Sequence, residues 1–406
     1  MNQLDIFGQL YKPFKFTKKV RLIELFAGVG SQAMALRDLG IPFEHHRVVE
    51  FDKYAIKSYN AIHGTNFPTS DIRDIHASDL DMANHNYQYI MTYSFPCQDL
   101  SKAGKQKGMS KGSGTRSGLL WEVERIIGEC YRDKCLPDVL LMENVPEVIE
   151  IKNIKDFLQW QAVLEACGYQ NYVKIINAKD QGIPQKRKRC FMVSILGDYS
   201  YSFPENVPLK LRLKDMLELE VDEKYYLSEK MVNFFAKHNE EHKKRGNGFI
   251  WQPRKLDGVA STIRANSSLA ATDNTVIQIG NCMPSATRDN PNQGRVYDQN
   301  GISPTLGCMQ GGNRQPMIIQ KSHGFNQGSK KAMCPSVTAS SFENNNFLES
   351  DQRIRKLTPL ECWRLMGFSD DDFFRAAKVN SNSQLYKQAG NSIVKQVLMA
   401  IFKQMM

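Results

Sequence analysis

The sequence predicts an α/β protein with a doubly wound, mostly parallel sheet and a second, smaller, β-rich domain. Three observations lead to this fold class. Short apolar runs alternate with helical patterns over residues 20–197, which is typical of βαβ units whose sheet is covered on both faces. A glycine-rich turn follows the first apolar run. After about Pro204 the composition shifts to Asn, Gln, Gly, Ser and Thr, without a long helical period. The expected parts are a first domain at 1–200 completed by 388–406, a second domain at 201–352, and a hinge or connecting segment at 353–387.

The apolar runs and helical spacings define the elements in order. The first strand, Val20–Phe26, ends in Ala-Gly-Val-Gly, and the helix Ser31–Leu39 follows and is closed by Gly40. The same signals recur downstream, with strands at Arg47–Phe51, Tyr87–Phe95, Asp138–Met142, Tyr172–Ala178 and Cys190–Leu196 and helices at Lys53–His63, Gly118–Arg132 and Asn153–Cys167. Because such a sheet binds ligands beyond the carboxyl ends of its strands, we expect the functional residues at those ends.

Three weakly similar units mark the second domain. Each has a short segment, at Ala260–Ile263, Ser303–Leu306 or Cys334–Val337, then a polar loop and an apolar pair. The pattern predicts repeated strand–loop–strand units, and chance similarity in a Ser/Asn-rich β region is the alternative. Helical spacing returns at Thr358–Met366 and at Ser392–Phe402.

The composition is that of a globular protein with a basic surplus. The 406 residues are 41% hydrophobic and 24% charged, which excludes disordered and collagen-like chains. No stretch approaches the roughly 18 apolar residues of a membrane span, and the first twenty residues do not resemble a signal peptide. The net charge of +10 favours a polyanionic partner. Nine scattered cysteines without a C-x-x-C pair argue against disulfides and zinc, and for a reducing cytoplasm.

A glycine-rich turn predicts a nucleotide-like ligand. Gly28-x-Gly30-x-x-Ala33 follows a strand and opens a helix, where glycines allow a ligand to approach the backbone. Glu50 ends the next strand, where an acid can accept hydrogen bonds from ribose hydroxyls. Phe51 can cover an adenine face, and Asp71 with Ile72 can reach its amino group. NAD, FAD and S-adenosylmethionine all fit this pattern, and tight helix–sheet packing is the alternative.

Three further motifs end or enter strands and supply reactive groups. Cys97 follows Pro96 at the end of a strand, and becomes a candidate nucleophile if neighbours activate its thiol. Glu143 ends the next strand, which a doubly wound sheet can bring beside Cys97. Arg187 and Arg189 alternate at the entry to a later strand, so we expect them to face the same way. The alternatives are an inert thiol for Cys97, a surface acid for Glu143 and a solvated basic edge strand for the two arginines.

The segment Asp99–Gly118 resembles a mobile lid that closes on phosphates, because it holds five basic residues, five glycines and one acid. A flexible linker is the alternative. His238 and His242 have a metal-like spacing, but they lie in a strongly charged stretch that is typical of a solvated helix. We therefore expect no metal site.

Taken in order, these residues resemble the C5-cytosine DNA methyltransferase family. The resemblance covers most of residues 20–197 and 353–402, with a variable region between them, and Phe95–Glu122 is particularly similar to prokaryotic and phage-type members, including CpG-specific ones. One departure is small, because Ala389 stands where many members carry a larger residue. The matching motifs are Phe26-Ala27-Gly28-Val29-Gly30, Pro96-Cys97-Gln98, Glu143-Asn144-Val145, Gln185-x-Arg187-x-Arg189, Arg355-Lys356-Leu357-Thr358-Pro359 and Gly390-Asn391-Ser392.

The resemblance implies a residue-level mechanism. Cys97 would attack C6 of cytosine, which makes C5 nucleophilic toward the methyl group. Glu143 would hydrogen-bond N3 and the exocyclic amine, Arg189 would hold O2, and Arg187 would position the site and a nearby phosphate. The residues implied in binding S-adenosyl-L-methionine are Phe26, Ala27, Gly28, Val29, Gly30, Glu50, Phe51, Asp71, Ile72, Pro96, Asn391 and Ser392.

The resemblance also implies duplex DNA as the partner, with the target cytosine flipped out of the helix. The region 201–352 would be the target-recognition domain, in which amides and arginines read base edges. The candidate DNA-binding residues are Gln98, Ser101, Lys105, Lys107 and Arg116 around the lid, and Arg264, Asn266, Arg288, Arg295, Gln310, Asn313 and Arg314 in the recognition region.

The expected role is restriction–modification or phage self-protection, in a cytoplasmic monomer that needs no physical contact with a cognate restriction endonuclease. Two alternatives differ in substrate or class: a tRNA cytosine C5-methyltransferase, and a non-catalytic DNA-binding regulator on the same fold. The large Asn/Gln-rich insertion argues against the first alternative, and the intact set of Cys97, Glu143 and Arg189 argues against the second.

Overall fold

The computed structural model describes residues 11–97, 99–100, 108–112, 114–225, 237, 239, 254, 258–263, 275–279 and 352–406. The chain forms two compact units. The first unit contains residues 1–216, 258–270 and 359–406, and the second contains residues 217–257 and 271–358. The sequence predicts that only 388–406 complete the first domain, whereas the first unit takes in all of 359–406.

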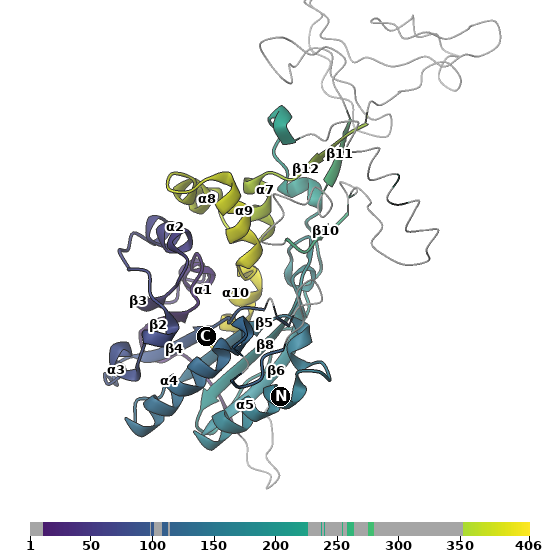
Figure 1. Cartoon of the computed structure of the whole chain (residues 1–406). Helices are drawn as coiled ribbons and strands as arrows, with labels where there is room; N and C mark the ends of the chain where they lie inside the picture. The colour runs from purple at the N-terminus through teal and green to yellow at the C-terminus, as the bar shows by residue number, and fades with distance from the viewer. Residues whose placement is uncertain are drawn as a thin grey trace, which may run out of the picture. The chain divides into compact units, whose positions relative to one another are not determined.

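A six-stranded sheet is the centre of the first unit (Figure 1). Its strands lie in the order β3-β2-β4-β5-β8-β6, and β8 alone runs antiparallel to its neighbours β5 and β6. The mostly parallel α/β sheet predicted from the sequence is therefore confirmed. The bounds of the strands are β2 (Val20–Leu25), β3 (Phe43–Val49), β4 (Gln88–Tyr93), β5 (Val139–Asn144), β6 (Tyr169–Asn177) and β8 (Lys188–Leu196).

The reversed direction of β8 was not expected from the sequence. Between β6 and β8 lie only the turn η4 (Ala178–Gln181) and the short strand β7 (Gln185–Lys186). A connection this short joins antiparallel neighbours, because a parallel crossover needs a dozen residues or more. The consequence is that the amino end of β8 lies at the same edge of the sheet as the carboxyl ends of β4 and β5.

Helices cover both faces of the sheet. The connections through α1 and α4 run in opposite directions along the sheet, so right-handed crossovers place these helices on opposite faces. The predicted helix Lys53–His63 coincides with α2, and the one predicted from Gly118 begins as the 3-10 turn η2. The bounds are α1 (Ser31–Asp38), α2 (Lys53–His63), η1 (Ile72–Asp74), α3 (Ala77–Leu80), η2 (Arg116–Leu119), α4 (Leu120–Arg132), η3 (Pro146–Ile149) and α5 (Ile154–Ala166).

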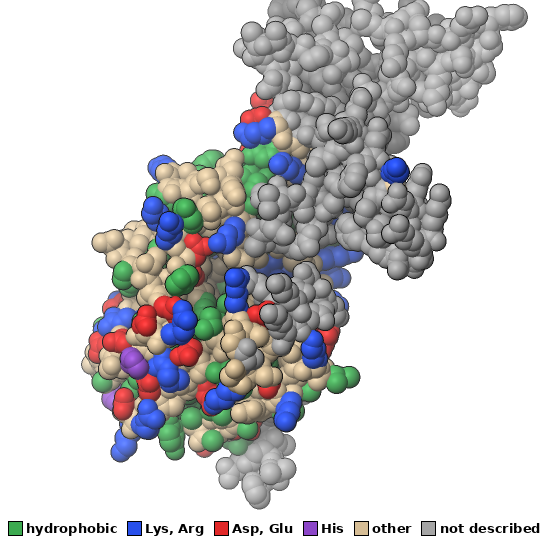
Figure 2. All heavy atoms as spheres, in the orientation of Figure 1, with side chains coloured by type: hydrophobic (Ala, Val, Ile, Leu, Met, Phe, Trp, Pro, Cys, Tyr) green, Lys and Arg blue, Asp and Glu red, His purple; other side chains and the backbone are tan. Residues whose placement is uncertain are grey.

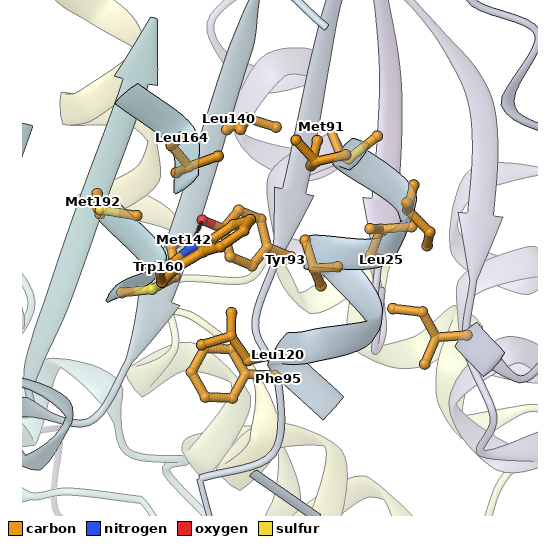
Figure 3. Close-up of a cluster of buried hydrophobic side chains, with 14 of the residues drawn as sticks. Leu25, Met91, Tyr93, Phe95, Leu120, Leu140, Met142, Trp160, Leu164 and Met192 are labelled. Carbon is orange, nitrogen blue, oxygen red and sulfur yellow. Dashed lines mark hydrogen bonds between the residues drawn. The ribbon is translucent and has the colours of Figure 1, made fainter. Parts of the chain in front are cut away.

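The main core lies between the sheet and helices α4 and α5 (Figure 3). Trp160 of α5 is fully buried against Tyr93 of β4, and its indole Nε1 donates a hydrogen bond to the Tyr93 hydroxyl over 2.9 Å. Leu120 and Phe95 continue this core toward the carboxyl edge of the sheet. Because packing of this kind fixes side chains in single rotamers, the ends of β4 and β5 rest on a rigid support.

The last four helices complete the first unit and are tied to its amino-terminal part. Lys387 of α9 contacts Asp52 at the start of α2 over 2.6 Å. The Gln388 amide accepts from Ser58 over 2.9 Å and donates to the Tyr54 carbonyl over 3.0 Å. These helices are α7 (Pro359–Leu365), α8 (Asp370–Ala377), α9 (Asn382–Asn391) and α10 (Lys395–Lys403), and α10 lies against α1.

Three small strand pairs complete the described elements. β10 (Ala260–Ser261) pairs with β7, and β1 (Lys12–Pro13) pairs with β9 (Tyr199–Ser200). β11 (Thr275–Ile279) pairs with β12 (Gln352–Lys356) in the second unit. The first predicted repeat therefore does contain two strands, but β10 and β11 pair elsewhere and not with each other. The other two repeats lie outside the described residues. Two 3-10 turns, η5 (Leu213–Met216) and η6 (Glu223–Tyr225), precede β10.

None of the helices that the structure describes is long and apolar enough to cross a membrane. Within the same residues there is no group of three or more His, Cys, Asp or Glu side chains able to hold a metal ion. His238 and His242 lie outside the described part of the chain.

Candidate active site

Five segments meet at one edge of the central sheet: the residues that follow β2, β3, β4 and β5, and the amino end of β8. The chain runs from β2 outward to β3 and then returns to the other side of β2 to form β4. This reversal creates a topological switch point between β2 and β4, which is the position where open α/β sheets bind ligands.

The two glycines after β2 occupy their positions for different physical reasons. Gly28 and Gly30 both have a positive φ, of +58° and +82°. A Cβ on Gly30 would lie 2.3 Å from His63 Nε2, so the helices α1 and α2 require glycine there for close packing. A Cβ on Gly28 would meet nothing within 4 Å, so open space adjoins this residue. The packing alternative thus accounts for Gly30 and leaves Gly28 facing room for a ligand.

Glu50 and Phe51 follow β3 beside this space. Glu50 is held by two backbone groups, because its Oε2 accepts from Gly28 N over 2.8 Å and its Oε1 accepts from Asp52 N over 2.7 Å. Burial raises the pKa of Glu50, and these backbone donors oppose that shift. Phe51 is 74% exposed, so it is not a core residue, and its ring is available to cover a planar ligand.

Asp71 and Ile72 lie in a turn in which the Asp71 carboxylate is already hydrogen-bonded. The Asp71 carboxylate caps η1 by accepting from Arg73 N over 3.0 Å, and it also pairs with the Arg73 guanidinium. This pairing lowers the pKa of Asp71. Ile72 is buried, with 4% of its side chain exposed. Asp71 is therefore ionised and already bonded, which is compatible with a shared hydrogen bond to a ligand amine.

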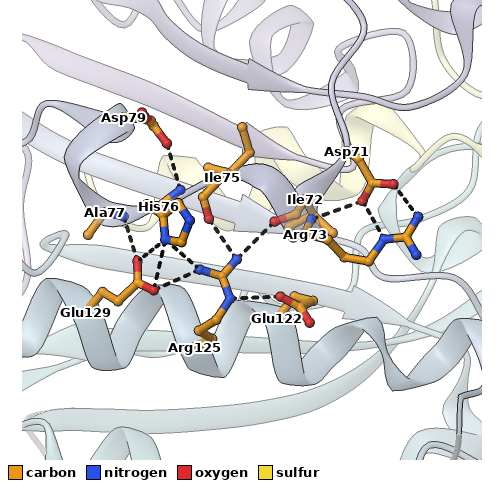
Figure 4. Close-up of polar contacts among 10 residues, drawn as sticks. All are labelled: Asp71, Ile72, Arg73, Ile75, His76, Ala77, Asp79, Glu122, Arg125 and Glu129. Atoms are coloured by element: carbon orange, nitrogen blue, oxygen red, sulfur yellow. Dashed lines mark hydrogen bonds and ion pairs between the residues drawn. The ribbon is translucent and has the colours of Figure 1, made fainter.

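Arg125 of α4 fixes the same turn from below (Figure 4). Its guanidinium donates to the carbonyls of Ile72 and Ile75 over 3.2 and 2.7 Å. It also pairs with Glu122 and Glu129 of its own helix. No local pattern marks Arg125 for this role, since acids at i,i+3 and i,i+4 are typical of an ordinary solvated helix face.

Cys97 is half-buried at the end of the segment that follows β4. The two residues before it are pinned by side chains from other elements. Asn144 Nδ2 donates to the Phe95 carbonyl over 3.0 Å, and Ser117 Oγ donates to the Pro96 carbonyl over 2.6 Å. Burial raises the pKa of the Cys97 thiol and the charge of Glu143 adds to this, whereas the two nearby arginines lower it.

An ion pair between Glu143 and Arg189 lies within electrostatic reach of Cys97. Arg189 Nε is 3.0 Å from Glu143 Oε1, and the two side chains are only 15% and 9% exposed. Glu143 is the fifth residue of β5 rather than the residue after it, and Phe191 of β8 lies opposite. The antiparallel direction of β8 is what brings Arg189 to this edge.

Arg187 does not lie as the sequence predicts. It falls between β7 and β8 instead of inside one strand, so strict alternation with Arg189 fails. Its guanidinium is buried and donates to the carbonyls of Ile263, Gly390 and Ser392 over 2.8, 3.0 and 2.7 Å. In this structure the group is bonded to the backbone, and the expected positioning of a DNA phosphate stays a prediction. Burial lowers the pKa of Arg187 to about 9, which keeps it charged at neutral pH.

Residues 20–406 match the family model for C-5 cytosine-specific DNA methylases. The chain belongs to this family. Its relatives include the orphan methyltransferase M.SPBetaI of Bacillus phage SPbeta, at 28% identity over 95% of this chain and 97% of the relative. The orphan methyltransferase M.SssI of Spiroplasma monobiae is 31% identical over 64% of this chain and 84% of the relative. A solved structure of S. pombe Dnmt2 methyltransferase shares the fold, with a TM-score of 0.60 at 20% identity over 95% and 97% of the two chains.

The resemblance read from the sequence is thus confirmed. This methyltransferase is an enzyme that acts on C5 of cytosine in DNA, with S-adenosyl-L-methionine as the methyl donor. The residues at the switch point fit that donor. The open space at Gly28, the anchored Glu50 carboxylate and the exposed Phe51 ring together offer room, a hydroxyl acceptor and an aromatic face.

The methyltransferase's candidate DNA-binding residues are only partly described. Arg116 is exposed in η2, and its backbone N–H donates to Asp99 Oδ2 over 2.9 Å. Gly108 N donates to the Asp99 carbonyl over 2.9 Å, so Asp99 at the start of the predicted lid is bonded to its middle as well as to Arg116. On the face in Figure 2, basic and acidic side chains are intermixed. Outside the described residues lie Gln98, Ser101, Lys105, Lys107, Arg264, Asn266, Arg288, Arg295, Gln310, Asn313 and Arg314.

Proposed function

We propose that this methyltransferase modifies a flipped-out cytosine at a specific sequence of double-stranded DNA through a covalent bond between Cys97 and C6. The observation that carries the proposal is the buried Glu143–Arg189 ion pair within electrostatic reach of Cys97. A carboxylate from β5, a guanidinium from β8 and a thiol from the segment after β4 lie at one edge of the sheet, where together they can bind one small polar ring. Cytosine is such a ring, and it presents N3, an exocyclic amine and O2 to these three groups.

The donor site is supported by the residues around the switch point. S-adenosyl-L-methionine supplies an electrophilic methyl group when it is bound. Glu50 would accept hydrogen bonds from the ribose hydroxyls, and Phe51 would cover the adenine. Asp71 would share its carboxylate with the adenine amine while Arg73 keeps it ionised. The remaining contacts come from the backbone of Phe26–Gly30, from Ile72 and Pro96, and from the turn Asn391–Ser392.

Each group of the catalytic set has a defined task. The Cys97 thiol loses its proton as its sulfur bonds to C6, and Arg189 favours the thiolate electrostatically. The electrons displaced from the C5–C6 double bond make C5 nucleophilic. Glu143 stabilises the ring by hydrogen bonds at N3 and the amine, and Arg189 does so at O2. After methylation a water molecule takes up the C5 proton. The electrons of the C5–H bond restore the C5–C6 double bond, and the S–C6 bond breaks to release Cys97 as a thiolate.

DNA recognition is assigned to the second part of the chain. We propose 201–352 as the target-recognition domain, 1–200 with 388–406 as the catalytic domain and 353–387 as the connection. Residues 99–118 close over the flipped base, whose unstacking costs a few kcal/mol. In a bacterial or phage-infected cytoplasm the enzyme would act as a monomer in restriction–modification or self-protection, without bound endonuclease. Relatives named as orphan methyltransferases of Bacillus phages support this role.

Covalent trapping tests the mechanism. Duplex DNA that carries 5-fluorocytosine at the target site should form a denaturation-resistant adduct with the parent protein, because fluorine blocks the loss of a C5 proton. Cys97→Ala should form none. Cys167→Ala is the matched control, since this half-buried thiol lies at the opposite edge of the sheet, at the end of α5, and should leave trapping unchanged.

Three results would overturn the proposal. An adduct that survives Cys97→Ala would remove this residue as the nucleophile. No adduct with the parent protein would favour a non-catalytic regulator. Trapping on tRNA in preference to duplex DNA would favour the RNA-acting alternative. Sequencing of DNA modified by the purified protein identifies the target site that the assay needs.

A further inference from the structure

Arg187 joins three parts of the chain that are distant in sequence. Its guanidinium donates to Ile263 in one segment and to Gly390 and Ser392 in another, while its backbone leads directly into the strand that carries Arg189. The side chain is 4% exposed. Its Nη1 and Nη2 are paired with these three carbonyls, whereas its buried Nε has no partner. Because an unpaired buried donor is costly, the loss of any of the three carbonyls would destabilise the guanidinium further.

Gln185, two residues before Arg187, also joins distant parts of the chain. Its Nε2 donates to the Leu365 carbonyl over 2.7 Å, and its Oε1 accepts from Ile263 N over 3.0 Å. The backbone of β7 pairs with β10, and Thr262 Oγ1 donates to the Lys186 carbonyl over 2.6 Å. The segment 258–263 is therefore held by side chains and by backbone.

The segment 258–263 lies in the sequence between two stretches of the second unit. Residues 217–257 and the stretch from 271 onward both belong to the second unit, whereas 258–270 belong to the first. The chain thus returns to the first unit once between two stretches of the second. Arg187 bonds to that returning segment at Ile263 and to the carboxyl end of α9 at Gly390 and Ser392, on either side of Asn391.

We propose that Arg187 is a positioning residue that couples donor binding at the Asn391–Ser392 turn to DNA binding by the second unit. This rests on the proposed function, in which that turn contacts the donor and the second unit reads the DNA. A displacement of Ile263 or of Ser392 breaks a hydrogen bond to the same buried guanidinium. Each ligand therefore favours the arrangement that the other requires, and Arg189 next to it is aligned only in that arrangement.

Thermodynamic coupling is the property to measure. The dissociation constant of S-adenosyl-L-homocysteine is determined by calorimetry, with and without saturating duplex DNA that carries the target site. We expect DNA to tighten binding in the parent protein by at least about fivefold, the lower end of allosteric coupling. In Arg187→Lys, which keeps the charge but loses the planar set of donors, the ratio should fall to about one. The lysine keeps a positive charge near Cys97, so the pH dependence of trapping should stay close to that of the parent.

Two further variants keep the test decisive. Arg375→Lys changes an exposed arginine of the same unit whose guanidinium pairs with Asp371 one turn earlier in α8, and it should keep the parent's ratio. Thr262→Val removes one hydrogen bond from the returning segment without touching Arg187, and it should lower the ratio even if Arg187→Lys fails to fold.

The outcomes separate this inference from the proposed function. A parent ratio of one, or an unchanged ratio in both Arg187→Lys and Thr262→Val, overturns the coupling role. If the parent protein still traps 5-fluorocytosine DNA through Cys97 in that case, the proposed function stands and only the coupling fails. If the parent protein does not trap 5-fluorocytosine DNA, the proposed function is refuted, and the coupling role that rests on it is refuted with it.

Discussion

Replacement of Glu24 by glutamine should make the protein gain stability, relative to the parent, as the pH rises from 5 to 8. Glu24 is the single acid inside the apolar strand β2 and is completely buried. The Tyr59 hydroxyl donates to its Oε2 over 2.5 Å, and the same hydroxyl lies 2.7 Å from His45 Nδ1. His63 packs on Tyr59 and reaches the Val29 carbonyl over 3.1 Å, so the cluster supports the glycine-rich loop.

The magnitude follows from the pKa of Glu24. Burial raises it from 4.5 to about 7, against the opposing effect of the Tyr59 hydrogen bond. The folded state therefore keeps this proton up to about pH 7, whereas the unfolded chain loses it above pH 4.5. Protonation of Glu24 stabilises the fold fully below pH 4.5, and this contribution is lost as the pH rises through about 7. Between pH 5 and pH 7 the loss is about 2 kcal/mol, because the full slope of about 1.4 kcal/mol per pH unit holds only well between the two pKa values.

The two histidines of the cluster act with the opposite sign. Burial lowers the pKa of His45 to about 4 and that of His63 to about 3. The folded state then binds fewer protons than the unfolded chain below about pH 6.5, so these residues make the protein more stable as the pH rises toward that value. Glu24→Gln retains both histidines. The difference between the two proteins isolates the carboxyl group.

Urea denaturation followed by tryptophan fluorescence at pH 5, 6, 7 and 8 measures the effect. The free energy of unfolding of Glu24→Gln minus that of the parent should rise by about 2.5 kcal/mol over this range. Tyr59→Phe is the companion variant. It removes the hydrogen bond that lowers the pKa of Glu24, so the stability loss should move to higher pH. If the difference in the free energy of unfolding between Glu24→Gln and the parent stays constant from pH 5 to pH 8, the reasoning is refuted.

Three further predictions concern the site. Phe51→Ala should weaken S-adenosyl-L-homocysteine binding about fivefold to tenfold by calorimetry and leave the melting temperature unchanged, because the ring is exposed; an unchanged affinity would place the adenine elsewhere. Arg125→Ala should raise the KM for S-adenosyl-L-methionine about tenfold at nearly constant kcat in steady-state assays, since it frees the turn at Ile72, and equal losses in both constants would contradict this. Asn144→Ala should cost about 1–3 kcal/mol of unfolding free energy and slow adduct formation at Cys97 in rapid-quench trapping, because it leaves the Phe95 carbonyl unpaired; normal trapping kinetics would exclude this positioning role.

Local pattern was enough to predict the order of the elements and the place of the reactive residues. Apolar runs predicted the strands, and helical spacing predicted the helix Lys53–His63, which is where α2 lies. Cys97 and Glu50 follow strands, as their sequence neighbours indicated. Signals of this kind are local, since they depend on side-chain spacing and on turn residues within a few positions of one another.

The tertiary structure decided the features that depend on contacts between distant parts of the chain. The antiparallel direction of β8 brings Arg189 to Glu143, and no residue within β8 encodes that partner. The bonds of Arg187 to the backbone at Ile263 and Ser392 likewise exist only once the two segments have met. The sequence by itself determined which groups are present and at which strand ends. Hydrogen bonds between remote segments decided which of them face the substrate, because the direction of a side chain depends on partners that no local pattern specifies.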